Sequence, residues 1–295
     1  MNALADVRFL QHSQPEQVTT RFDAEYGVIW GFMDPKPRPT FNMQLLTELR
    51  GYIDSIIEPG GTAWHNGVQH KINYAVVASK VSGVFNLGGD LSLFREAIAR
   101  SDRELLVGYG RKCVDNLYPW SRNCDLPLTT IALVQGEALG GGFECALSAS
   151  VLVAEESSRM GFPEILFNLF PGMGAYSFLE RKVGKRAAED LISSGRVYGA
   201  DDMLALGVVD LVVDKGRGES EVGNFIKSRS RSRNGMAGIA AARAGRTTRA
   251  PDTCCSTPLL ARTRQSINQS ACSTAATRIV QTARKRGTSV TYTAD

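Results

Sequence analysis

Histidine is scarce in this chain of 295 residues, which contains only His12, His65 and His70. None of them belongs to an HExxH pattern, so a zinc site built by histidines is not expected. We interpret His65 and His70 as ordinary loop residues. A serine nucleophile with a histidine base is poorly supported, because the sequence also lacks the GxSxG elbow.

Motifs that bind phosphate or dinucleotides are missing as well. The sequence contains no GxxxxGK[ST]. Gly172 and Gly174 are followed by Ser177 at the position where GxGxxG requires its third glycine. We therefore expect no nucleotide cofactor, and no metal site is predicted either.

Long apolar runs and paired cysteines are also lacking. No run of about 18 apolar residues occurs, so no transmembrane helix is expected. Asp6 and Arg8 lie where a secretory signal would be apolar. The six cysteines form no CxxC pair, which favours reduced thiols. These features together predict a cytoplasmic protein.

Acidic residues and leucine become rare toward the C-terminus. Residues 216–295 contain 14 Lys and Arg, 4 Asp and Glu, two leucines, and an arginine–serine run at 227–233. A segment of this composition buries little apolar surface and is a candidate for disorder. RNA binding is one interpretation. The favoured interpretation is a tail whose sequence has not been selected for packing, because the rest of the chain carries no RNA-binding motif.

The preceding part of the chain alternates between strand-like and helix-like segments. Strands are predicted at 26–33, 73–79, 83–87, 128–135 and 151–154, and helices at 41–56, 91–118, 143–150, 165–170 and 175–183. Such alternation predicts an α/β fold with a largely parallel sheet.

Two glycine-rich turns, at 85–91 and 136–144, each follow an apolar strand and open a helix. Glycine lets the backbone approach a ligand closely, and the start of a helix offers free N–H groups. Two such N–H groups that converge on one oxygen form an oxyanion hole. A phosphate-binding loop is the competing interpretation.

Glu144 and Glu164 are the candidate acid–base residues. Glu144 comes just after three glycines, and Glu164 lies between apolar residues in Gly161–Ile165. An apolar environment raises the pKa of a carboxyl group, which suits proton transfer near neutral pH. Either glutamate alone is more often structural. Together with both glycine turns, the pair favours catalysis.

These features resemble the crotonase (enoyl-CoA hydratase/isomerase) superfamily over about residues 24–212. The resemblance is carried by FNLGGDL at 85–91, IALVQGEALGGGFE at 131–144 and GFPEILFNLFPGMG at 161–174. It implies an α/β crotonase (ClpP-like) fold of repeated ββα units. We expect an N-terminal extension at 1–23, a catalytic core at 24–215, and the basic segment 216–295 in place of the family's helical trimerisation region. One hypothesis for that segment is a shifted reading frame.

A finer resemblance is to the diffusible signal factor synthases of plant-pathogenic bacteria. It lies in the N-terminal extension, the DPKPRPTFN loop at 34–42 and the insert Trp64–Lys71. It implies a lyase and thioesterase that acts on a 3-hydroxyacyl thioester of acyl carrier protein. The product would be a cis-2-unsaturated fatty acid used in quorum sensing and virulence. The receiver domain of a sensor histidine kinase and a homotrimer are the implied protein partners.

The resemblance also implies residue roles. The backbone N–H groups of Leu87 and Gly141 would hold the thioester oxygen, and Glu144 and Glu164 would share the acid and base work in an order left open. The implied substrate-binding residues are Gly88, Leu139, Gly140, Pro163, Phe170 and Met173. Three alternatives stay open: an enoyl-CoA hydratase of fatty-acid oxidation, a non-catalytic partner of a sensor kinase, and a nucleic-acid-binding protein.

Overall fold

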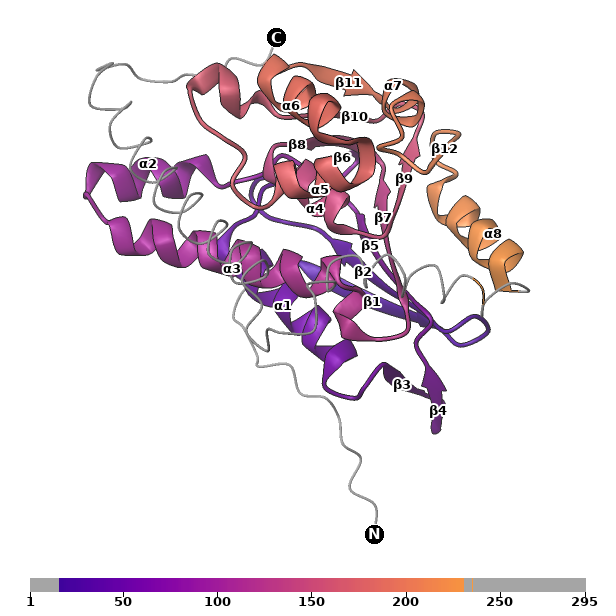
Figure 1. Cartoon of the computed structure of the whole chain (residues 1–295). Helices are drawn as coiled ribbons and strands as arrows, with labels where there is room; N and C mark the ends of the chain where they lie inside the picture. Colours follow the sequence, from indigo (N-terminus) through magenta and orange to yellow (C-terminus); the bar gives the residue numbers. More distant parts are fainter. Residues whose placement is uncertain (1–15, 231–234, 236–295) are drawn as a thin grey trace, which may run out of the picture.

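The computed structural model describes residues 16–230 and residue 235 (Figure 1). Its larger sheet has six strands in the order β1-β2-β5-β7-β9-β12. They are β1 Val18–Asp23, β2 Val28–Met33, β5 Tyr74–Ser79, β7 Thr129–Val134, β9 Val151–Glu155 and β12 Leu211–Val213. Only the β1–β2 pair in this sheet is antiparallel. The prediction of a largely parallel sheet is therefore confirmed.

A second sheet of four strands stands beside the first, in the order β11-β10-β8-β6. Its strands are β6 Gly83–Asn86, β8 Gly136–Leu139, β10 Arg159–Gly161 and β11 Val197–Gly199. Each of the consecutive pairs β5–β6, β7–β8 and β9–β10 gives its first strand to the larger sheet and its second to the smaller one. A helical segment follows each pair. The predicted fold of repeated ββα units is thus confirmed.

The helices cover both faces of the larger sheet (Figure 1). They are α1 Met43–Ile57, α2 Leu91–Ala99, α3 Arg103–Ser121, α4 Gly141–Ser148, α5 Ala175–Val183, α6 Lys185–Ser194, α7 Ala200–Ala205 and α8 Gly218–Ser230. Two short 3-10 segments are η1 Asn123–Asp125 and η2 Pro163–Phe167. The main apolar core lies between the larger sheet and helices α1, α3 and α4, whereas α8 packs on the other face. The second glycine turn opens α4, which is one of these core helices, and the first opens α2.

Helix α1 shows how the sequence builds this layer. The Asn42 side chain caps its first turn by accepting a hydrogen bond from the N–H of Leu45 at 2.8 Å. Residues at helical spacing, including Leu49 and Ile56, are buried against the sheet. The helix predicted over 41–56 is confirmed.

Two predicted helices differ from those observed. The helix expected over 91–118 is broken into α2 and α3, because Ser101 has a left-handed φ of 54° and Asp102 caps a new helix. The helix expected over 165–170 is instead the 3-10 segment η2, which begins at Pro163 and ends where Asn168 turns left-handed. Local apolar spacing predicts a helix in both places without locating these breaks.

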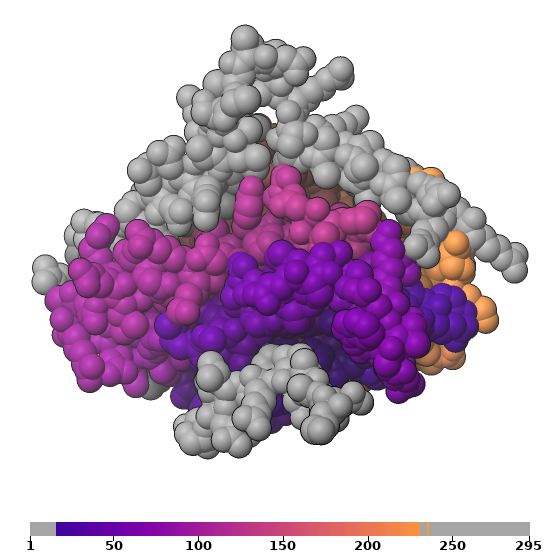
Figure 2. All heavy atoms as spheres, turned by 90° about the horizontal axis from the view of Figure 1, so that it is seen from below, coloured from indigo at the N-terminus to yellow at the C-terminus, as the bar shows by residue number. Residues whose placement is uncertain are grey.

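The expected limits of the catalytic core are too narrow. Strand β1 lies before residue 24 and pairs with β2 along its whole length, so part of the predicted extension belongs to the sheet. Helix α8 lies after residue 215, and its Val222 and Ile226 are 0% and 1% exposed against the sheet. Arg21 of β1 forms an ion pair with Glu219 of α8 at 2.8 Å, and Figure 2 shows the orange helix beside the indigo N-terminal strands. The core therefore extends at both ends.

The rest of the basic segment, apart from residue 235, lies outside the described residues. The proposals for disorder, RNA binding and a shifted frame in that part therefore stay predictions. Within the described part of the chain, no helix is both long and apolar enough to cross a membrane.

Candidate active site

The first glycine turn lies against the loop that precedes α1. The N–H of Leu87 donates to the carbonyl of Pro39 at 2.8 Å, and the N–H of Phe41 donates to the carbonyl of Gly88 at 2.8 Å. Because the Leu87 N–H is already used inside the protein, it cannot hold a substrate oxygen. The prediction of Leu87 as an oxyanion-hole donor is therefore wrong.

Gly89 and Gly141 provide the free N–H groups instead. Among the described residues, neither N–H donates to a backbone or side-chain acceptor. Gly141 is the first residue of α4, where helix geometry leaves N–H groups without an internal partner. A Cβ built on Gly141 would lie 3.7 Å from the nitrogen of Gly89. The two donors therefore sit side by side, as an oxyanion hole requires.

Glycine is required around this pair because the backbones touch. Gly88 has a φ of +89°, and a Cβ there would lie 2.9 Å from both the nitrogen of Gly141 and the carbonyl oxygen of Leu139. Gly140 has a φ of +53°, and a Cβ there would overlap the carboxylate of Glu164. Side chains at these positions would fill the space in front of the N–H groups or displace the glutamate.

Glu144 lies in the first turn of α4, where it is 1% exposed. Its Oε1 accepts hydrogen bonds from the N–H groups of Met173 at 2.7 Å and Ala175 at 2.9 Å. Burial raises the pKa of Glu144 from 4.5 to about 8, with a further contribution from the charge of Glu164, although the backbone N–H groups act in the opposite direction. This carboxyl group can therefore carry a proton at neutral pH.

Glu164 follows Pro163 in the first turn of η2. Its Oε1 faces Gly140, and its Oε2 is buried with no hydrogen-bond partner among the described residues. Burial raises the pKa of Glu164 from 4.5 to about 7. The expectation that apolar surroundings raise this pKa agrees with the structure. An unpartnered carboxylate oxygen in an acid–base site is free to accept or deliver a proton.

The sequence profile of the enoyl-CoA hydratase/isomerase family matches residues 32–228, more than half of the chain. These residues include both glycine turns and both glutamates. The chain belongs to this family.

Curated relatives of the chain include fatty acid oxidation complex alpha subunits. The protein of Pseudomonas paraeruginosa is 31% identical over 173 residues, which are 59% of this chain and 22% of that subunit. The chain thus spans less than a quarter of the length of these relatives.

Solved structures show the same fold at low identity. The enoyl-CoA hydratase of Bacillus halodurans superimposes with a TM-score of 0.73 at 17% identity, over 90% of this chain and 99% of the other. Pseudomonas aeruginosa DspI superimposes with a TM-score of 0.67 at 23% identity, over 83% and 93% of the two chains. At these identities the likeness establishes the fold.

The predicted substrate-binding residues differ in how they lie relative to the glycine turns and the two glutamates. The carbonyl of Leu139 faces Gly88, and the sulfur of Met173 lies over Gly141. Pro163 begins η2 directly before Glu164. The Phe170 side chain is 47% exposed, and no hydrogen bond or ring contact links it to the glutamates in the described structure. Leu139, Gly140, Pro163 and Met173 thus lie beside the glycine turns and the glutamates, whereas the role of the half-exposed Phe170 in substrate binding stays a prediction.

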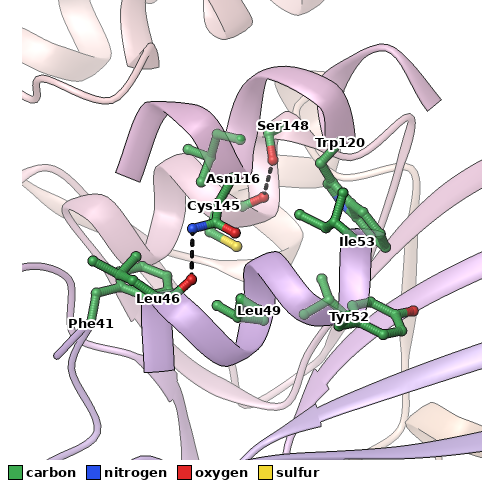
Figure 3. Close-up of a pocket in the computed structure, with 11 residues that line it drawn as sticks. Phe41, Leu46, Leu49, Tyr52, Ile53, Asn116, Trp120, Cys145 and Ser148 are labelled. Carbon is green, nitrogen blue, oxygen red and sulfur yellow. Dashed lines mark hydrogen bonds between the residues drawn. The ribbon is translucent and has the colours of Figure 1, made fainter. Parts of the chain in front are cut away.

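A small apolar cavity lies behind α4, between that helix and helices α1 and α3 (Figure 3). Its volume is about 20 Å³, and its lining includes Leu49, Trp120 and Cys145. The side chain of Asn116 at its edge donates to the carbonyl of Leu46 at 3.0 Å. A volume of this size holds about one water molecule. A space of this size is too small for an acyl chain, so this cavity is not the acyl site.

Sequence reasoning missed Gly89 as a donor and the loop at 39–41 as its neighbour. Gly89 was visible in the motif. The hydrogen bond that occupies the N–H of Leu87, however, goes to the carbonyl of Pro39, which lies 48 positions away in the sequence. Within the described residues, no group of three or more His, Cys, Asp or Glu side chains is arranged to hold a metal ion.

Proposed function

We propose that the protein dehydrates a 3-hydroxyacyl thioester of acyl carrier protein and then hydrolyses the thioester, which releases a cis-2-unsaturated fatty acid as a diffusible signal. The observation that carries this proposal is the meeting of Glu144 and Glu164 beside the free N–H groups of Gly89 and Gly141. Two carboxyl groups and an oxyanion hole are the parts that this chemistry requires.

The oxyanion hole acts on the thioester carbonyl. The N–H groups of Gly89 and Gly141 donate to the carbonyl oxygen, which acidifies the neighbouring carbon and stabilises the enolate formed when its proton leaves. One glutamate accepts that proton. The other donates its proton to the β-hydroxyl, so that the C–O bond breaks, the double bond forms and water departs.

The protonation states of the two glutamates fit this division of work. Their pKa values are raised to about 8 for Glu144 and about 7 for Glu164. Because burial raises both pKa values and two nearby carboxylates resist joint ionisation, the pair keeps at least one proton near neutral pH. Dehydration moves one proton to the pair and one proton away from it, so the pair regains its starting charge when the product forms.

The same groups support the hydrolytic step. A carboxylate takes a proton from water as the oxygen attacks the thioester carbon, and the N–H groups hold the resulting oxyanion. The C–S bond then breaks, and the protonated carboxyl group returns its proton to the thiolate of the carrier. We further propose that the substrate is a carrier-protein thioester and that the protein is cytoplasmic. We also propose that it forms a homotrimer and that the receiver domain of a sensor kinase is its partner.

Hydration of enoyl-CoA in fatty-acid oxidation is the second candidate. It uses the same carboxyl pair and oxyanion hole in the reverse direction. The observation that favours it is the similarity to alpha subunits of fatty acid oxidation complexes. The two candidates differ in the carrier of the thioester and in the release of free acid.

A mass-spectrometric assay separates these functions. The protein is incubated with matched medium-chain 3-hydroxyacyl thioesters of acyl carrier protein and of coenzyme A. Glu144→Ala and Glu164→Ala are compared with Glu137→Ala, which changes an exposed glutamate on β8. We expect enoyl product and free acid from the carrier-protein substrate, retained in the Glu137 variant and lost in the other two. Turnover confined to coenzyme A without free acid would favour the hydratase, and no turnover by folded protein would refute both.

A further inference from the structure

Asn86 lies at the point where strand β6 becomes the first glycine turn. The pairing of β6 with β8 shifts register between Val84 and Asn86, so that Asn86 stands opposite Ala138. Such an irregularity changes the direction of the strand and the side chains that follow it. Asn86 is 0% exposed, so its side chain does not reach solvent or substrate.

The side chain of Asn86 shapes the turn that contains Gly89. Its Oδ1 accepts a hydrogen bond from the N–H of Gly88 at 2.7 Å. An asparagine that accepts from the residue two positions later forms a turn of its own, and here that turn holds Gly88 at its left-handed φ of +89°. The next N–H along the chain, that of Gly89, is thereby left free.

The backbone of Asn86 sets the other half of the oxyanion hole. Its carbonyl lies so close to Gly142 in α4 that a Cβ on Gly142 would overlap it. Asn86 thus contacts the turn before Gly89 and the helix start beside Gly141. The Nδ2 of Asn86 is buried with no hydrogen-bond partner among the described residues. A buried donor without a partner is costly, and such costs persist where the residue has another role.

We propose that Asn86 is the positioning residue of the oxyanion hole, because it fixes the Gly89 and Gly141 N–H groups at the spacing that one carbonyl oxygen requires. This inference rests on the proposed function, since it names a further residue for the same reaction. Asn86 itself does not touch the substrate.

The first test compares Asn86→Ala with Asn86→Ser. The two side chains are nearly equal in volume, but only serine offers the Gly88 N–H an acceptor in a turn of this kind. We expect alanine to lower kcat on the order of 100-fold with little change in KM, because a small displacement of donors is that costly. Serine should recover a substantial part of this loss at the same melting temperature. Equal loss in both variants, or a loss of kcat that follows the melting temperature, would overturn the proposal.

A spectroscopic test reads the hole directly. In a Glu164→Gln background, which halts turnover, the infrared stretch of an isotope-labelled thioester carbonyl should shift to lower frequency on binding. The added Asn86→Ala change should abolish this shift, and Asn86→Ser should restore part of it. A shift that persists unchanged in the alanine variant would show that Asn86 does not position the donors.

Hydrogen exchange separates failure of this inference from failure of the proposed function. In the protein without substrate, Asn86→Ala should accelerate amide exchange in residues 86–91 and leave helix α5 unchanged. If the wild type turns over no thioester, the proposed function fails while accelerated exchange still supports the positioning role. If the wild type is active and neither exchange nor kcat responds to Asn86→Ala, the positioning role fails and the proposed function stands.

Discussion

Replacing Glu144 by glutamine should make the folded protein more resistant to alkaline pH. Glutamine keeps an oxygen that can accept from the N–H groups of Met173 and Ala175, so the local hydrogen bonds are preserved. It cannot ionise, however, so the variant never places a negative charge inside the protein. The comparison therefore isolates the cost of charging a side chain that is 1% exposed.

The size of the effect follows from the pKa of Glu144, which folding raises from 4.5 to about 8. Below pH 4.5 Glu144 is protonated in both the folded and the unfolded protein, so its burial costs the wild type no stability relative to glutamine there. Between pH 4.5 and 8 the unfolded protein releases this proton more readily than the folded protein does. Its stability falls as the pH rises through this window, and the full penalty is reached above pH 8. At 1.36 kcal/mol per pKa unit, the full penalty is at most about 5 kcal/mol.

Urea unfolding of both proteins at pH 5 and pH 9, at one protein concentration, measures this penalty. The stability of Glu144→Gln relative to wild type should increase by about 4 kcal/mol between the two pH values. Glu137→Gln, which changes an exposed residue, serves as the control and should show the same offset at both. If Glu144→Gln also keeps a constant offset, the argument that folding holds a proton on Glu144 is wrong.

Three further predictions follow from the site and its support. Gly140→Ala should reduce activity on the order of 100-fold, because its Cβ would overlap the Glu164 carboxylate, and crystallography or turnover assays would check this. The pH profile of kcat/KM should be bell-shaped with its maximum between about 7 and 8, and the same in Glu137→Gln, as steady-state assays would show. Ile226→Ala should destabilise the fold by about 2–5 kcal/mol in urea unfolding, because this α8 side chain is buried; an unchanged protein would mean that α8 is not part of the core.

The sequence predicts the fold class and the catalytic carboxyl groups because both depend on local patterns. Alternating apolar segments indicate the parallel sheet, and the helix over 41–56 follows from spacing alone. Glu144 and Glu164 stand out because each lies next to glycine or apolar residues in the chain. Their raised pKa values follow from that burial, which the neighbouring residues already suggest.

Other features depend on contacts between distant segments and could not be predicted in this way. The break between α2 and α3, the burial of Ile226 in α8, and the exposure of Phe170 are outcomes of packing that composition does not specify. Composition made residues 216–295 a candidate for disorder, although its first helix covers a sheet face. A few apolar residues at helical spacing are enough to bury one face of a helix when the sheet offers an apolar surface to pack against.

The oxyanion hole shows most clearly what the sequence determines and what only the tertiary structure determines. The motif at 85–91 by itself determined that a glycine turn would present backbone N–H groups, since glycine permits close approach wherever it occurs. Whether the Leu87 N–H is free was decided only by the tertiary structure, where the carbonyl of Pro39 accepts a hydrogen bond from it. A donor's availability depends on every acceptor that folding brings near it, and an acceptor such as the Pro39 carbonyl lies far from the motif in the chain.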